Sequence, residues 1–187
     1  MNENSRYYSA MLPRRIENRP LPHVTIQCPV YKEGLASVIV PTVKSLKAAM
    51  STYELQGGSA NMFINDDGMQ LISAEERQAR IEFYADHSIG WTARPKHGKD
   101  GFVRKGKFKK ASNMNYGLML SNRVEEKLAL VERSEMWQQT EEAIEYARCL
   151  GEVLDEEEGR AWADGNIRVG DYIILSGSNS HARRCRN

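Results

Sequence analysis

Cysteine is scarce in this chain of 187 residues, which holds Cys28, Cys149 and Cys185. Their spacing matches neither a paired disulfide framework nor a set of metal ligands. This argues against a small disulfide-stapled domain and against a zinc site built from cysteines. Cys28 stands in an apolar run, where we expect a buried thiol, and such cysteine usage is typical of a reducing compartment.

Long apolar runs and an excess of one charge are also missing. No run approaches the ~18 apolar residues of a membrane span, and residues 1–19 are too polar for a signal peptide. Lys and Arg number 26 against 25 Asp and Glu, a formal net charge of +1. The sequence therefore has no overall attraction to nucleic acid or to a membrane, and we expect the chain as given to be soluble and cytosolic.

The composition is that of an ordinary globular protein, with 41% hydrophobic and 27% charged residues. The length suits one domain with a core of its own. We expect an irregular leader over 1–22, a globular domain over 23–175 and a disordered basic tail over 176–187.

The most informative stretch is the apolar run 62–64, followed by Asn65, Asp66, Asp67 and Gly68. A short run with β-branched and aromatic members favours a strand buried on both faces. Ligands of open α/β sheets bind at the carboxyl ends of such strands, where two carboxylates accept hydrogen bonds or help to hold a metal. The alternative is an ordinary turn, since Asn, Asp and Gly are common turn residues.

Strands and helices alternate along the rest of the chain, which predicts an α/β fold with a mostly parallel sheet. A first strand alternates over 24–30, with Pro29 ending its hydrogen bonding, and a helix follows with Pro41 near its first turn. Ser73 and Glu76 form a capping-box pattern that begins a helix reaching about residue 86. Further strands are expected at 89–93 and 171–175.

Residues 94–110 carry eight Lys or Arg against one acid, Asp100. The stretch is either a solvated basic loop or an anion site, because it leads into a helix over 111–120 that Ser112 or Asn113 would cap. Residues 121–158 read as two amphipathic helices broken near Ser134, a helical insertion before the last strand. Their acidic end, 152–158, is expected to be solvated.

Four motifs in order resemble the family 2 glycosyltransferases with a GT-A fold, especially the fungal family 2-like group. They are a strand ending at 29–33, the Asp-Asp-Gly of 66–68, the helix start 109–118 after a basic loop, and a final strand after 170–171. Lys32 and Ser112 depart from the family pattern, which has Asn and Gly there. The resemblance covers about residues 22–175 and implies a Rossmann-like nucleotide-binding half that is incomplete.

This resemblance implies a hexosyltransferase that takes a nucleotide sugar, commonly a uridine diphosphate (UDP) sugar, as donor. The acceptor would be a polysaccharide, a lipid or a protein glycan. A full-length relative would be membrane-bound, with this domain facing the cytosol. Carried over by motif, the residues that would bind the donor nucleotide are Pro29, Tyr31, Glu33, Asp66, Asp67, Lys110, Asn113 and Asn115.

The family also implies Mn²⁺ or Mg²⁺ held by an Asp-x-Asp motif after the last strand, which neutralises the leaving diphosphate. Here those positions fall near Gly177 and Asn179, which supply no carboxylate. No residue stands where the family's general base would be, and His97 reads as a loop histidine. We therefore expect the metal site to be lost and the chain to be a truncated donor-binding half with weak or no activity.

Two other functions stay open at this point. The nucleotide pocket could persist in a non-catalytic binding module or pseudoenzyme. Nucleic-acid binding through 94–110 is disfavoured, because only Phe102 and Phe108 accompany its cations and the overall charge is near neutral.

Overall fold

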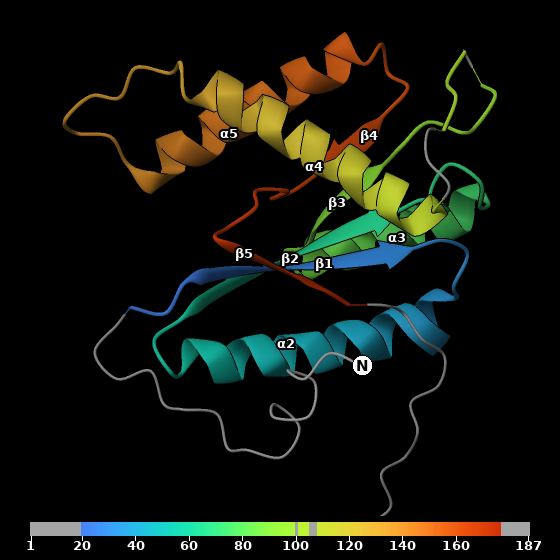
Figure 1. Ribbon diagram of the computed structural model, residues 1–187, viewed down its shortest axis with the longest axis horizontal. Coiled ribbons are helices and arrows are strands. Elements are labelled where there is room, and N and C mark those ends of the chain that lie inside the picture. Colours follow the sequence, from blue (N-terminus) through green and yellow to red (C-terminus); the bar gives the residue numbers. More distant parts are fainter. Residues whose placement is uncertain (1–19, 100, 105–107, 177–187) are drawn as a thin grey trace, which may run out of the picture.

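The computed structural model describes residues 20–99, 101–104 and 108–176, which build an α/β sandwich around a mostly parallel sheet (Figure 1). Its strand order is β4-β3-β2-β1-β5. Neighbours are parallel except β4, which runs antiparallel to β3. The predicted α/β class is confirmed. The strands are β1 (His23–Val30), β2 (Ser59–Asp66), β3 (Gly90–Ala93), β4 (Trp162–Asp164) and β5 (Tyr172–Leu175).

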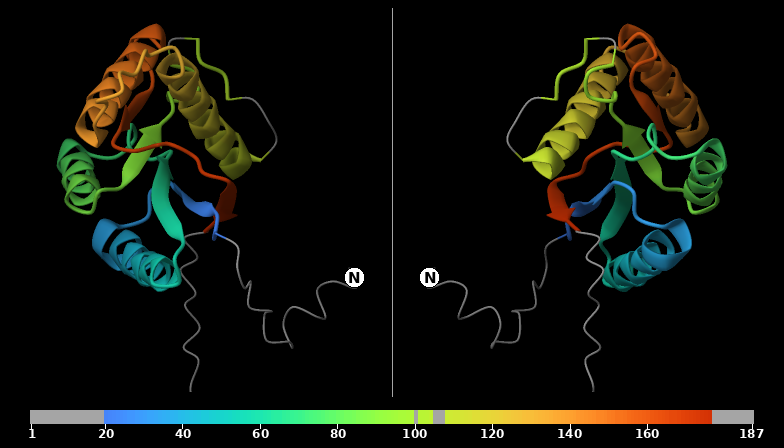
Figure 2. Two further views of the ribbon diagram at one scale, coloured as in Figure 1. Left: turned by 90° about the vertical axis from the view of Figure 1, so that its left-hand side faces the viewer. Right: turned by 90° about the vertical axis from the view of Figure 1, so that its right-hand side faces the viewer.

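Helices cover both faces of the sheet (Figure 2). One face carries α2 (Val40–Glu54), preceded by the π-helical turn η1 (Leu35–Ile39), and α3 (Ala74–Asp86). The other face carries α4 (Lys109–Leu128), and α5 (Gln139–Glu156) packs on α4 and β4. Pro41 lies in the first turn of α2, and Ser73 and Glu76 cap α3 reciprocally, as the sequence predicted.

The two faces have separate cores. Even-numbered residues of β1 and β2, such as Cys28 and Ile64, pack with Val43 of α2 and Tyr84 of α3. On the opposite face Phe63 packs with α4 and α5. This division follows from the two-residue period of a strand.

Beneath the first half of α4 the sheet is polar. Gln27 Nε2 donates to the Met114 carbonyl at 3.2 Å, and Asn113 Nδ2 donates to the Asn65 carbonyl at 2.9 Å. Gly117 allows this approach, since a Cβ there would stand 2.2 Å from Asn65 Nδ2. Directed hydrogen bonds set the position of α4 on the sheet more narrowly than apolar packing would.

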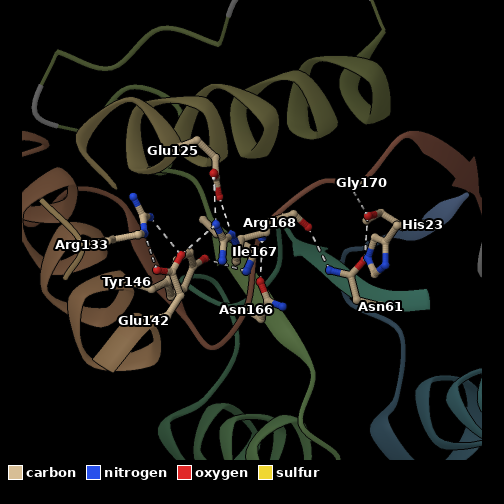
Figure 3. A network of polar contacts seen from close by, with 11 residues as sticks. His23, Asn61, Glu125, Arg133, Glu142, Tyr146, Asn166, Ile167, Arg168 and Gly170 are labelled. Atoms are coloured by element: carbon tan, nitrogen blue, oxygen red, sulfur yellow. Dashed lines mark hydrogen bonds and ion pairs between the residues drawn. The ribbon is translucent and has the colours of Figure 1, made fainter. Parts of the chain in front are cut away.

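A polar network ties the segment before β5 to both helices of this face (Figure 3). Arg168 Nε donates to Glu125 of α4 at 2.6 Å, and its guanidinium lies over the ring of Tyr146 of α5 at 5.6 Å. The Arg168 carbonyl accepts from Asn61 Nδ2 of β2 at 2.9 Å. β5 is thereby held beside β1, where its residues are exposed.

Several predicted boundaries were wrong. β2 continues through Asn65 and Asp66, both fully buried, because β1 and β3 pair with this end of it. Neither Ser112 nor Asn113 caps α4, which begins at Lys109 with no capping side chain. The short β4 was not predicted.

Pro29 does not end the β1–β2 ladder. Its pairing continues to Val30, because Ser176 N donates to Gln27 O and the missing Pro29 N–H therefore falls on the β5 side. Most of the expected leader and tail lies outside the described residues.

Candidate functional site

A cavity of about 230 Å³ opens at the carboxyl ends of β1 and β2, beside the start of α4. The chain leaves β1 for β2 and β3 on one side and returns to β5 on the other. Such a reversal of strand order is where open α/β sheets bind ligands. The lining residues are Pro29, Val30, Tyr31, Glu33, Asp67, Arg104, Lys109, Lys110 and Asn113.

Asp66 supports the cavity without lining it. Both carboxylate oxygens accept from Arg80 Nη1, at 2.8 and 2.7 Å, and Oδ2 also accepts from the Tyr84 hydroxyl at 2.9 Å. Its side chain is fully buried, and Gly68 N adds a fourth hydrogen bond at 3.1 Å. Burial raises the pKa of Asp66, and the Arg80 charge opposes that rise.

Asp67 does line the cavity, and it is held by a second arginine. Arg94 Nε donates to Oδ1 at 2.6 Å and Nη2 donates to Oδ2 at 2.8 Å, a bidentate pair in which the Arg94 side chain is 1% exposed. Arg104 Nη2 approaches Oδ1 at 3.4 Å. Two-point contact of this kind holds a carboxylate in one orientation.

The wall on the β1 side is the loop that follows Val30. Tyr31 N donates to Glu33 Oε2 at 2.5 Å, which curls the loop over the end of the strand. The backbone of this loop lies close to Gly68, where an added Cβ would stand 1.6 Å from the Tyr31 carbonyl oxygen. The glycine of Asp-Asp-Gly is therefore required by this close approach.

The opposite wall is the first turn of α4 with its preceding segment. Lys109 and Lys110 are exposed, and the first backbone N–H groups of a helix have no partner within the helix, so charge and dipole both favour an anion. Arg104 adds a third cation to the lining. Asn113 Oδ1 is buried with no hydrogen-bond partner among the described residues, an acceptor left for a ligand donor or a water.

The described residues do not fit a divalent cation. Within 20–99, 101–104 and 108–176 no three His, Cys, Asp or Glu side chains come together as a ligand set. Arginines already occupy the carboxylates of Asp66 and Asp67. Gly177 and Asn179, the positions of the expected metal motif, lie outside the described residues.

Six of the eight predicted site residues line this one cavity: Pro29, Tyr31, Glu33, Asp67, Lys110 and Asn113. Asp66 is turned into the α3 side, and Asn115 lines a separate hollow with Tyr116 and Arg160.

Four further residues of the site were not predicted from the sequence: Arg80, Arg94, Arg104 and Lys109. The basic stretch 94–110 held the signal for the last three. Arg80 gave none, because an arginine in a charged helix ordinarily faces solvent.

In the part of the chain that the structure describes, no helix combines the length and the apolar character needed to cross a membrane. Searches of protein-family models, of curated proteins and of solved structures found no match to this chain.

Proposed function

We propose that this chain binds a nucleotide sugar, of the UDP type, in the cavity at the end of β1 and acts in glycosyl transfer. The observation that carries the proposal is the convergence of motifs distant in sequence. The loop after β1, the Asp-Asp-Gly end of β2 and the basic start of α4 meet around one cavity. The glycosyltransferase resemblance assigns donor binding to these same three motifs.

The two walls suit different parts of such a ligand. The loop of Tyr31 and Glu33 offers an aromatic ring and a carboxylate for the nucleoside, which has a flat base and hydroxyl donors. Lys109 and Lys110 offer cations and helix N–H groups for the diphosphate. A volume of about 230 Å³ is below the roughly 300–1,000 Å³ of most ligand pockets, so the sugar would lie outside it.

In glycosyl transfer the bond between the sugar and the diphosphate breaks while an acceptor hydroxyl attacks the sugar. Negative charge then develops on the departing diphosphate, and Lys109, Lys110 and the start of α4 would stabilise it. We assign no general base to the described residues.

A binding module without turnover is the second candidate, and the arginine-paired carboxylates favour it. The carboxylates of Asp66 and Asp67 are already paired with arginines and are poor ligands for a metal ion. Nucleotide binding would therefore not depend on metal.

Titration calorimetry with UDP, with and without Mn²⁺, separates the candidates. Metal-independent binding that is lost in Lys110→Ala and kept in Lys99→Ala supports the cavity as the site, since Lys99 is exposed and does not line it. Mn²⁺-dependent binding together with release of sugar from a UDP sugar would favour the enzyme. Absence of UDP binding by the folded chain would contradict both.

A further inference from the structure

Asp66 is the last residue of β2 and Asp67 the first residue of the turn after it, and the two carboxylates contact different arginines. Asp66 faces α3 and meets Arg80, and Asp67 faces α4 and meets Arg94. All four side chains are at least nine-tenths buried. One dipeptide therefore holds two guanidinium groups, one from α3 and one from the residue that follows β3.

Besides pairing with Asp66, Arg80 donates hydrogen bonds to the loop after β1, which forms one wall of the cavity. Its Nη1 donates to the Tyr31 carbonyl at 3.1 Å, and its Nη2 donates to the Glu33 carbonyl at 2.7 Å. Both acceptors belong to residues that line the cavity. The position of this loop relative to β2 thus depends on a side chain that does not itself reach the cavity lining.

Arg94 connects Asp67 to the other wall of the cavity, which is formed by the start of α4. Beyond its bidentate pair with Asp67, its Nη2 donates to the Lys109 carbonyl at 3.1 Å and its Nη1 donates to Ser112 Oγ at 2.9 Å. Lys109 and Ser112 belong to the first turn of α4. Arg94 also neutralises the Asp67 carboxylate, which would otherwise repel an anion beside Lys110.

We propose that Arg80 and Arg94 are positioning residues that set the two walls of the cavity independently, Arg80 the nucleoside wall and Arg94 the diphosphate wall. The inference rests on the proposed function, which assigns those walls. Arg80 would then affect how the nucleoside binds, and Arg94 how the diphosphate binds. Neither arginine lines the cavity.

The test compares uridine, which is neutral, with UDP, which carries the diphosphate, on the full chain. Arg94→Lys keeps a charge beside Asp67 and loses the guanidinium fork that reaches Lys109 and Ser112. UDP should bind about tenfold more weakly, the equivalent of one charge-assisted hydrogen bond, while uridine changes by less than about twofold. Arg80→Lys should weaken both ligands about tenfold and leave their affinity ratio unchanged.

Two further variants reach the walls without altering the buried charges, and Ser112→Ala, the milder of the two, serves where a lysine variant does not fold. Gly68→Ala puts a methyl group against the Tyr31 carbonyl and should behave like Arg80→Lys. Ser112→Ala removes one Arg94 contact and should lower UDP affinity alone. Arg148→Lys, on the exposed face of α5, is the control.

A general loss of stability would change both ligands alike in every variant, so equal effects on uridine and UDP in Arg94→Lys would overturn the inference. A changed affinity ratio in Arg80→Lys would overturn it as well. If the unaltered chain binds neither ligand, the proposed function fails, and this inference fails with it. Binding by the unaltered chain with the wrong pattern among the variants rejects the inference alone.

Discussion

The Tyr84 hydroxyl of α3 donates to Asp66 Oδ2 of β2 at 2.9 Å, with both side chains fully buried. Burial and the Asp66 charge raise the pKa of Tyr84 well above its usual value, so the hydroxyl is protonated and donates at neutral pH. This hydrogen bond joins α3 to the end of β2, beside which the cavity opens.

Removing this hydroxyl should destabilise the fold. Tyr84→Phe leaves the ring packed and one lone pair of Asp66 unsatisfied, which costs about 1–3 kcal/mol because the acceptor is buried. Urea denaturation measures the change as a lower midpoint with an unchanged slope. Tyr172→Phe is the control, since that residue is 63% exposed. Equal midpoints for Tyr84→Phe and the unaltered chain would contradict the expectation.

Two helical glycines should respond in opposite ways to substitution by alanine. A Cβ at Gly117 of α4 would stand 2.2 Å from Asn65 Nδ2 and 2.7 Å from Phe63 Cζ, whereas a Cβ at Gly151 of α5 meets nothing within 4 Å. Gly117→Ala should lower the free energy of unfolding by about 2 kcal/mol or more. Gly151→Ala should raise it by about 0.5–1 kcal/mol through helix propensity. Thermal or urea unfolding measures both, and the same sign for both variants would refute this account.

Cys28 should be protected from alkylation while the chain is folded. Burial raises the pKa of its thiol to about 11, and Glu33 and Asp66 add to the rise. At pH 8 the reactive thiolate is then about a thousandth of the total. Iodoacetamide labelling followed by peptide mass spectrometry should find Cys28 unmodified at pH 8 in the folded chain and modified after unfolding. Rapid labelling of the folded chain would show that the thiol is reachable.

The same thiol makes stability depend on pH. The unfolded chain releases the Cys28 proton near pH 9 and the folded chain near pH 11, so between these values the unfolded state binds fewer protons. The Cys28 contribution is complete below pH 9 and is lost as the pH rises through 11, a change of about 3 kcal/mol. The difference in unfolding free energy between the unaltered chain and Cys28→Ala should therefore shrink over that interval, and a constant difference would reject the assignment.

The edge of the sheet at β5 should promote self-association. Tyr172, Ile173, Ile174 and Leu175 are all exposed, and β5 pairs on one side only among the described residues. An apolar strand edge with no charge on it is a template for pairing. Ile174→Lys should lower concentration-dependent association in sedimentation velocity. Leu55→Lys, at an 86% exposed site on the α2 end, is the control and should leave association unchanged.

The sequence predicted the motifs of the site better than the contacts that hold them. Asp66 and Asp67 stood out because two carboxylates and a glycine follow an apolar run. Their partners Arg80 and Arg94 lie 14 and 27 residues away, and no local pattern distinguishes a buried guanidinium from a solvated one.

The start of α4 shows the same limit. Ser112 was predicted as a cap from the preference of serine for that position. In the structure Ser112 Oγ accepts from Arg94 instead, within the helix. β4 was missed because a strand of three residues is too short to show a two-residue period. Long-range partners decided each of these outcomes, and local preferences alone do not contain them.

Pairing of β1 with β5 also constrains how the molecule folds. His23 N donates to Asp171 Oδ2 across 148 residues, so this contact closes a very long loop. Closing a loop of that length costs conformational entropy, so the contact forms slowly and after contacts between residues nearer in sequence. The β1–β2–β3 layer, with α2 and α3, would assemble first, and β5 would dock last. A slow phase in refolding, removed by Arg168→Met at the network that leads into β5, would identify that final step.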